Sequence, residues 1–165
     1  MKFRILLVPA LAVLTTLMMS GCGSSTNREA DRIERLYRYM VSTIENEDIN
    51  GVMSLYSPGF LENGYNKTDV RNIYLDFFAA YHNIDENITV RDIDISGNYA
   101  AVEIREWWQA RDQNGTLVYV DPAIFVDYWK YENGDWYLYG NQEYDISLKQ
   151  AKPLRYGAGR PVKVK

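Results

Sequence analysis

The chain has 165 residues, of which 47% are hydrophobic and 14% aromatic, and its formal net charge at pH 7 is −4. This length suits one domain, and the hydrophobic content argues against intrinsic disorder. The acidic balance gives no general attraction to nucleic acid, so we expect no nucleic-acid partner. The single cysteine excludes an intramolecular disulfide, so a packed core must hold the fold together.

Residues 1–21 have the pattern of a bacterial export signal, in which a basic start precedes a largely apolar run too short for a comfortable membrane span. The motif Met19-Ser20-Gly21-Cys22 resembles the bacterial lipobox, although leucine is usual where Met19 stands. The resemblance implies cleavage before Cys22 and acylation of Cys22, which would anchor the protein in a lipid bilayer. Gly23 after the cysteine implies the outer membrane, with the protein facing the periplasm. The alternative is an ordinary secretory signal or an uncleaved anchor.

The next part of the chain has the hydrophobic periodicity of helices. Residues 22–27 are expected to form the acylated cysteine and a flexible tether, and from about Asn27 to Glu47 the apolar residues recur with the spacing of one helical face. A second, short helix is predicted from Asp48 to Tyr56. A third begins at Thr68, which we expect to cap it.

After a loop predicted at residues 83–87, the hydrophobic period changes from 3.6 to 2. Strands are predicted over residues 88–95, 99–111, 116–131 and 135–146. The last two are joined at Asn133-Gly134, and Asn-Gly between aromatic-rich runs is a strong hairpin signal. Helices followed by an antiparallel meander predict an α+β domain over residues 28–147. Residues 148–165, in which every charged side chain is basic, are expected to form a flexible tail.

Three stretches together resemble the nuclear transport factor 2-like (SnoaL-like) cone. They are NEDINGVMSLYSPGF, VRDIDISGNYAAVEI and DYWKYENGDWYLYGNQ, within residues 28–145. The resemblance implies N-terminal helices packed on a curved antiparallel or mixed sheet, a cystatin-like cone roll, with a pocket between the helices and the concave face. The family hosts isomerases, dehydratases, epoxide hydrolases and many non-catalytic modules, so this fold does not define a function.

Strand pairing places one acid among the aromatic rings. A two-residue turn at Asn114-Gly115 would set three pairs on one face: Glu106 with Ala123, Ile104 with Phe125, and Val102 with Asp127. The second hairpin would pair Tyr131 with Trp136, Trp129 with Leu138, Asp127 with Gly140, and Phe125 with Gln142. A bulge at Pro122 would flip the part of the first pairing nearer the turn. Both registers put Asp127 on the apolar face.

Asp127 in this position could act as a general base on a small apolar ligand, with Tyr56, Tyr74 or Gln142 as polar partners. Glu106 would be a second carboxylate nearer the pocket mouth. In the alternative interpretation Asp127 is structural and only orders the sheet. The predicted pocket lining consists of Tyr56, Tyr74, Phe77, Ile104, Trp108, Phe125, Trp129, Trp136 and Gln142.

The only histidine, His82, lies at the end of the third predicted helix, where an imidazole can cap carbonyl groups. A histidine–aspartate dyad would require this side chain to point into the cone. The sequence has no His or Cys spacing typical of a metal site and no phosphate-binding glycine loop. We therefore expect no metal and no cofactor.

Four aromatic residues fall on the convex face by the same parity: Trp107, Tyr128, Tyr137 and Tyr139. Such a patch suggests a partner surface, and the family resemblance favours a homodimer; carbohydrate stacking is an alternative. Three hypotheses for function follow. The protein is an anchored, non-catalytic module that binds a small apolar ligand or a protein partner, or it is a cofactor-free isomerase, dehydratase or hydrolase that uses a pocket aspartate. Otherwise it is an assembly or dimerisation module of the cell envelope.

Overall fold

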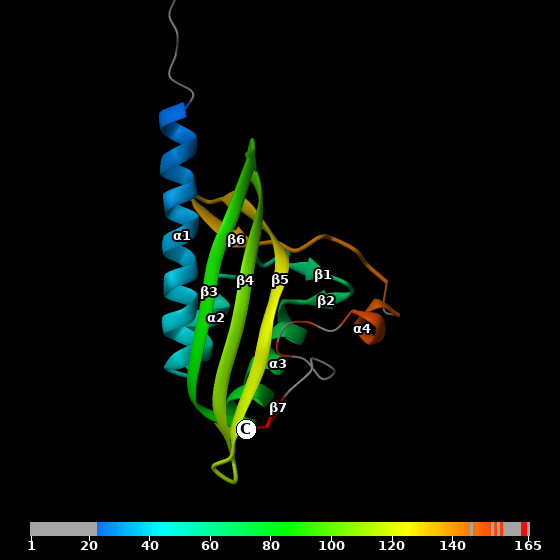
Figure 1. Cartoon of the computed structure of the whole chain (residues 1–165). Helices are drawn as coiled ribbons and strands as arrows, with labels where there is room; N and C mark the ends of the chain where they lie inside the picture. The colour runs from blue at the N-terminus through cyan, green and yellow to red at the C-terminus, as the bar shows by residue number, and fades with distance from the viewer. Residues whose placement is uncertain (1–22, 146, 153, 155, 157–162, 165) are drawn as a thin grey trace, which may run out of the picture.

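Three helices lie against the inner side of a curved antiparallel sheet in the computed structural model (Figure 1), which describes residues 23–145, 147–152, 154, 156, 163 and 164. The main strands are β3 (Tyr81–Ser96), β4 (Tyr99–Asp112), β5 (Leu117–Glu132) and β6 (Asp135–Leu138), and they pair in this order. β1 (Leu61–Glu62) and β2 (Tyr65–Asn66) form a separate small hairpin. This arrangement confirms the predicted α+β class and the curved sheet.

α1 (Gly23–Glu45) is the long helix of the cone. Its inner stripe is buried against the sheet and consists of Ile33, Tyr37, Met40 and Ile44. These residues recur at helical spacing, as the periodicity predicted. The helix begins at Gly23, so the segment expected to be a free tether belongs to its first turns, while Cys22 lies outside the described residues. None of the helices within the described ranges is long and apolar enough to cross a bilayer.

α2 (Ile49–Ser54) packs against α1, and α3 (Lys67–Ala80) packs against α2 and β3. The prediction that Thr68 caps α3 is wrong, because Asn66 does so. The Asn66 side chain accepts hydrogen bonds from the backbone N–H groups of Thr68 and Asp69, and the Asp69 carboxylate accepts one from the Asn66 N–H at 2.9 Å. This reciprocal capping box satisfies donors at the start of the helix.

β3 begins at Tyr81, so the segment 83–87 predicted as a loop is part of a strand. Asn83 has φ of 50° and lies in a register shift between His82 and Asp85. Ile84, within this irregularity, and Glu86, beyond it, are both buried. The local irregularity explains why periodicity alone placed the start of the strand too late.

The β4–β5 register agrees with the prediction around Asp127 because two departures cancel. Val102 faces Asp127, Ile104 faces Phe125, and Glu106 faces Ala123. The turn between β4 and β5 has three residues rather than two, since the N–H of Asp112 bonds to the carbonyl of Thr116 at 3.0 Å. This turn shifts the pairs next to it by one residue, so that Trp108 faces Val120. A bulge opposite Trp107 then removes the offset, and the predicted register returns from Glu106 and Ala123 onwards.

β6 separates from β5 earlier than predicted. Trp129 pairs with Leu138 and Tyr131 with Trp136, as expected, but the predicted pairs of Asp127 with Gly140 and of Phe125 with Gln142 do not form. Gly140 has φ of 76°, and a Cβ atom there would lie 2.3 Å from the carbonyl oxygen of Leu61. The chain therefore turns towards the β1–β2 hairpin, where the Gln142 N–H bonds to that same oxygen at 2.9 Å.

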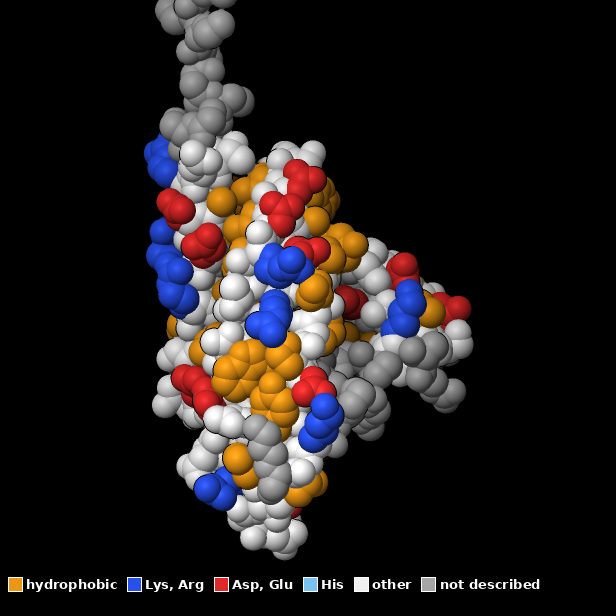
Figure 2. Space-filling view, viewed as in Figure 1, with side chains coloured by type: hydrophobic (Ala, Val, Ile, Leu, Met, Phe, Trp, Pro, Cys, Tyr) orange, Lys and Arg blue, Asp and Glu red, His pale blue; other side chains and the backbone are white. Residues whose placement is uncertain are grey.

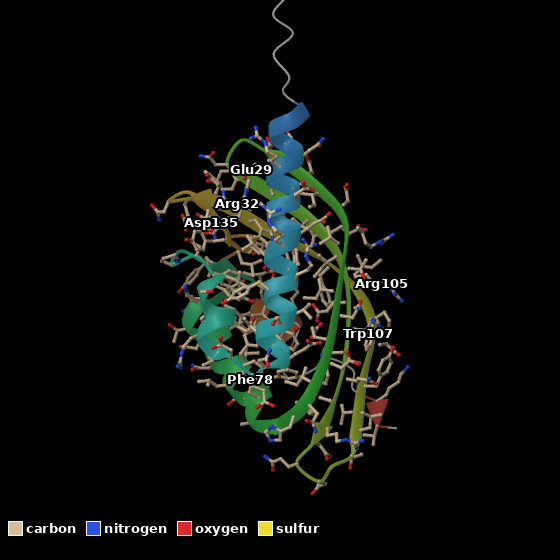
Figure 3. The ribbon with its side chains drawn as sticks, turned by 90° about the vertical axis from the view of Figure 1, so that its left-hand side faces the viewer. Glu29, Arg32, Phe78, Arg105, Trp107 and Asp135 are labelled. Atoms are coloured by element: carbon tan, nitrogen blue, oxygen red, sulfur yellow. The ribbon has the colours of Figure 1, made fainter. Side chains whose placement is uncertain are left out.

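α1 is tied to the β5–β6 hairpin by polar contacts near its N-terminal end (Figure 3). The indole N–H of Trp136 donates to Glu29 at 2.7 Å, and Arg32 forms an ion pair with Asp135 at 3.1 Å. Trp136 and Trp129 are both buried, which places the two indoles together in the core between helix and sheet.

The described part of the C-terminal segment packs against the domain instead of forming the free tail that we expected. α4 (Leu148–Ala151) is held by a hydrogen bond of 2.7 Å from the Tyr65 hydroxyl to the carbonyl oxygen of Lys149. β7 (Lys163–Val164) pairs with β5. Between these elements, Leu154 and Tyr156 pack on the hydrophobic core.

Candidate functional site

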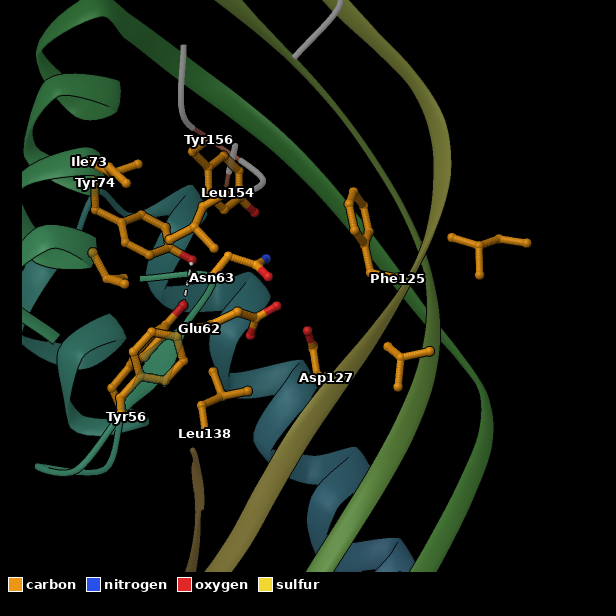
Figure 4. A pocket seen from close by; sticks show the side chains of 14 residues that line it. Tyr56, Glu62, Asn63, Ile73, Tyr74, Phe125, Asp127, Leu138, Leu154 and Tyr156 are labelled. Atoms are coloured by element: carbon orange, nitrogen blue, oxygen red, sulfur yellow. Dashed lines mark hydrogen bonds between the residues drawn. The ribbon is translucent and has the colours of Figure 1, made fainter. Parts of the chain in front are cut away.

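A cavity of about 300 Å³ lies between the helices, the β1–β2 hairpin, β5 and the C-terminal segment (Figure 4). It sits beside the stretch of β5 from which β6 has turned away. The lining residues come from parts of the chain that are far apart in sequence: Tyr56, Phe60, Glu62, Asn63, Val70, Ile73, Tyr74, Ile124, Phe125, Val126, Asp127, Leu138, Leu154 and Tyr156.

Asp127 is the buried acid of this pocket, with 6% of its surface exposed. Its Oδ2 accepts a hydrogen bond of 2.7 Å from the hydroxyl of Tyr37, which in turn accepts one of 2.9 Å from the indole N–H of Trp129. The Tyr37 and Trp129 rings meet edge to face with centroids 5.2 Å apart. This chain of donors fixes the carboxylate, because each polar group in it orients the next.

Tyr37 was not among the predicted site residues. The sequence placed it on the inner face of the first helix, and a buried tyrosine hydroxyl needs a polar partner. That requirement is the signal that could have linked Tyr37 to Asp127. Its partner lies 90 positions away, however, and only the packing of α1 on β5 brings the two together.

A second polar group in the pocket is the hydroxyl pair of Tyr56 and Tyr74, whose oxygens lie 3.5 Å apart. The ring of Tyr56 also meets that of Phe60 edge to face, with centroids 4.9 Å apart. Behind Tyr56, the ammonium of Lys67 donates to the Tyr56 carbonyl oxygen, and burial lowers the pKa of Lys67. One wall of the pocket is thus aromatic, with hydroxyls facing each other.

The β1–β2 hairpin adds a carboxylate, Glu62, and an amide, Asn63, neither of which was among the predicted site residues. Asn63 has φ of 49°, and its side-chain oxygen accepts a hydrogen bond of 2.9 Å from the Asn141 amide. Figure 4 shows the side chains of Glu62 and Asp127 directed into the same space. The pocket therefore combines two acids with ring-lined walls, an arrangement that can bind and orient a small ligand bearing hydrogen-bond donors.

The structure brings three residues of the predicted pocket lining, Tyr56, Tyr74 and Phe125, together at the cavity with the predicted acid, Asp127. Five others do not line it and instead form the buried core beside it: Phe77, Ile104, Trp108, Trp129 and Trp136. The reason is geometric, because α1 and α3 fill the inner side of the sheet at these positions.

Two predicted polar residues also lie elsewhere. Glu106 is fully buried in β4 between Ile88 and Ala123 and does not line the cavity. Gln142 is exposed, and its side-chain amide donates to the carbonyl oxygen of Tyr139 at 2.6 Å. Gln142 leaves the pocket because the chain departs from β5 at Gly140.

His82 does not form a dyad with Asp127. Its Nδ1 lies 3.2 Å from Oε1 of Glu47, the imidazole is exposed, and the residue is not part of the pocket lining. Among the described residues, no three His, Cys, Asp or Glu side chains are grouped so that they could hold a metal ion.

No family model matches the sequence, and no curated protein matches it. Solved structures do match. A protein of the NTF2-like family from Streptomyces avermitilis superposes with a TM-score of 0.54 and 15% identity, over 69% of this chain and 94% of that one. For a ketosteroid isomerase-like protein from Erwinia carotovora atroseptica, the TM-score is 0.56 and the identity is 18%, over 69% of this chain and 93% of that one. A hexachlorocyclohexane dehydrochlorinase superposes with a TM-score of 0.60 and 9% identity, over 71% of this chain and 84% of that one.

This chain has the NTF2-like cone fold. The matching structures cover more than two thirds of this chain, and its helices packed on a curved antiparallel sheet agree with their fold class. Sequence identities this low support a shared fold but not a shared reaction, since one fold hosts many functions. The function of this NTF2-like cone therefore has to be argued from its own residues.

The outward face of the cone carries an apolar patch, and Figure 2 shows hydrophobic side chains gathered there with Lys and Arg side chains near its border. Ile124, Val126 and Tyr128 are 55%, 42% and 41% exposed. The other predicted surface residues, Trp107, Tyr137 and Tyr139, are half-buried on or beside this face, and Trp107 points away from α1 in Figure 3. We call Ile124, Val126 and Tyr128 the convex patch.

Proposed function

We propose that this protein is a lipid-anchored binding protein of the bacterial cell envelope, whose cone holds a small ligand without converting it. The observation that carries this proposal is the fixed carboxylate of Asp127 in the wall of an aromatic cavity of about 300 Å³. A pocket of this size accepts a small ring compound, with its apolar body on the rings and one polar group on the acid.

The contacts of Asp127 favour binding over catalysis. One carboxylate oxygen is occupied by the Tyr37 hydroxyl, which is itself held by Trp129, so the acid is set rigidly in the wall. The single histidine of the chain pairs with Glu47 instead, which leaves no imidazole beside Asp127 to share a proton. A fixed acceptor of this kind suits recognition of a donor group on the ligand.

A second candidate function is proton transfer by Asp127 in a cofactor-free isomerase, dehydratase or hydrolase. It is favoured by the burial of Asp127 and by the nearby hydroxyls of Tyr56 and Tyr74, since a general base needs a polar partner for the developing charge. The two candidate functions predict different effects when Asp127 is replaced by asparagine, its isosteric amide. Binding tolerates Asp127→Asn, whereas proton abstraction does not.

The test uses indole, a small ring with one N–H donor, added to the mature protein and followed by NMR chemical shifts. We expect saturable shifts at Phe125 and Tyr74, a change of less than about tenfold in Kd for Asp127→Asn, and loss of binding for Ile73→Trp, which fills the cavity. Thermal unfolding checks that Ile73→Trp remains folded. Indole binding that is unchanged by the filled cavity would contradict the proposal.

The anchor is supported by the lipobox-like motif that ends at Cys22. Because α1 begins at the next residue, acyl chains on Cys22 would bring the N-terminal end of α1 and the nearby hairpin turns close to the bilayer (Figure 1). Metabolic labelling with a fatty acid tests the anchor. Label should enter the wild-type chain and be absent from Cys22→Ala.

The convex patch favours a role in association. Ile124, Val126 and Tyr128 are large apolar residues exposed side by side on one strand, as expected for a surface that a partner covers. A second copy of this chain is the partner we propose, because the same strand in each copy could pack across a two-fold axis.

A further inference from the structure

The C-terminal segment places a phenol ring in the wall of the pocket. The ring of Tyr156 packs against those of Tyr74 and Phe77, with centroid distances of 4.9 and 4.7 Å and interplanar angles of 43° and 44°. The Tyr156 hydroxyl donates a hydrogen bond of 2.8 Å to Oε2 of Glu86. The surrounding groups thus contact both parts of a phenol, its ring and its hydroxyl (Figure 4 shows the ring beside Tyr74).

The groups around this phenol belong to the regular elements of the fold. Tyr74 and Phe77 are buried residues of α3, and Glu86 is a buried residue of β3. Tyr156, in contrast, is half-buried and lies outside any helix or strand. The groups that bind the phenol therefore belong to the cone itself, while the phenol comes from the C-terminal segment.

The segment that carries Tyr156 is attached on both sides. Before it, the Lys149 ammonium pairs with Asp69 at 2.8 Å, and its carbonyl accepts from Tyr65. After it, β7 pairs with β5 at Val118 and Tyr119. None of these attachments involves the Tyr156 ring, so a ligand that takes the place of the ring need not break them.

We propose that the position of the Tyr156 ring is a subsite for phenolic ligands, and that the ligand of the pocket carries a hydroxylated aromatic ring that displaces Tyr156. This proposal rests on the proposed binding function and names its ligand class. The Tyr74 and Phe77 rings supply tilted aromatic contacts. Oε2 of Glu86 selects a hydroxyl on the ring, because a ligand without that donor would leave this buried acceptor without the hydrogen bond that Tyr156 supplies.

The test uses p-cresol, which reproduces the tyrosine side chain, and toluene, which lacks only the hydroxyl. In Tyr156→Ala the site is vacated, so we expect p-cresol to bind at least about tenfold more tightly than to the wild type, where it must displace the native ring. We expect toluene to bind that variant about tenfold more weakly than p-cresol. Titrations followed by NMR on the full mature chain give both ratios.

Matched variants separate the contribution of the ligand's hydroxyl to affinity from that of its ring. Tyr144→Ala removes a tyrosine that is 84% exposed and should behave as the wild type. Adding Glu86→Gln to Tyr156→Ala should weaken p-cresol but leave toluene unchanged. In case the glutamine variant does not fold, Tyr156→Phe serves instead: it keeps the ring but removes its hydrogen bond, so its affinity for p-cresol should lie between those of the wild type and Tyr156→Ala.

The outcomes distinguish this proposal from the one on which it rests. Equal affinities for p-cresol and toluene in Tyr156→Ala would overturn the phenolic class while leaving the pocket a binding site. If neither p-cresol nor toluene binds Tyr156→Ala while the wild type still binds indole, the subsite alone would be overturned. Failure of all three probes would overturn the binding function as well.

Discussion

The hydroxyl of Tyr37 on α1 donates a hydrogen bond of 2.7 Å to the carboxylate of Asp127 on β5, across 90 positions of sequence. This contact joins the long helix to the middle of the sheet at the wall of the pocket. It also shows how a helix that packs mainly through an apolar stripe can deliver one polar group to a buried acid. Tyr37 is therefore the residue whose change tests both the stability and the site.

Replacing Tyr37 with Phe should destabilise the protein by about 1–3 kcal/mol, because Asp127 loses a donor and the Trp129 indole loses an acceptor inside the core. Urea unfolding of the mature chain measures the change. Tyr39→Phe is the matched control, since Tyr39 is on the same helix and 45% exposed. Equal stabilities of the two variants would show that the buried hydroxyl contributes nothing.

Replacing Gly140 with Ala should cost about 3 kcal/mol or more, since the new Cβ would meet the Leu61 carbonyl oxygen and φ is 76°. Gly97→Ala is the comparison, because Gly97 also has a positive φ, 59°, but has nothing within 4 Å. Its cost should be about 1 kcal/mol, from backbone strain alone. Thermal unfolding of both variants measures the difference, and a smaller cost at Gly140 than at Gly97 would contradict the close approach.

The Ser57 hydroxyl donates a hydrogen bond of 2.6 Å to Glu132 and holds the pKa of that carboxyl below its ordinary value of 4.5, with Lys130 adding to the effect against the opposing effect of burial. A lowered pKa in the folded state stabilises the protein above pH 4.5, and this contribution disappears as the pH falls through the folded pKa. Ser57→Ala should therefore raise the Glu132 pKa in an NMR titration.

The stability difference between wild type and Ser57→Ala should shrink as the pH falls below about 4.5, because the protonated Glu132 no longer favours the folded state. Ser42→Ala, at an exposed position of α1, should show no such dependence. A difference that grows in acid would mean that the hydrogen bond favours the neutral carboxyl.

Replacing Tyr128 with Arg should weaken self-association by placing a charge in the convex patch. Sedimentation equilibrium at micromolar concentration should give a dimer mass for the wild type and a monomer mass for this variant. Tyr39→Arg, a similar change at an exposed site on α1, should leave the dimer intact. A wild-type protein that is monomeric at these concentrations would exclude the homodimer.

Much of the fold could be predicted because its signals are local. The helical stripe on α1 and the Asn133-Gly134 turn each depend on residues close in sequence. The side of the sheet that Asp127 occupies could be predicted as well, since alternation fixes which face a strand residue takes. That prediction survived a three-residue turn and a bulge only because the two shifts compensate.

The remaining features of the site depend on contacts between distant segments. Gln142 was expected opposite Phe125 because regular pairing was extended past Gly140, where the chain instead approaches Leu61. Glu86 was missed because the bend near Asn83 hides the start of β3. No short-range pattern predicts that Tyr156 packs against Tyr74 and Phe77.

The sequence by itself determined the order of helices and strands, the aromatic hairpin and the inward position of Asp127, because periodicity and turn chemistry act over a few residues. Only the tertiary structure decided that β6 leaves β5, that a cavity opens beside the part of β5 that β6 leaves, that Tyr37 reaches Asp127, and that Tyr156 reaches the cavity. These features arise where segments far apart in sequence compete for the same space, and only packing of the whole chain resolves that competition.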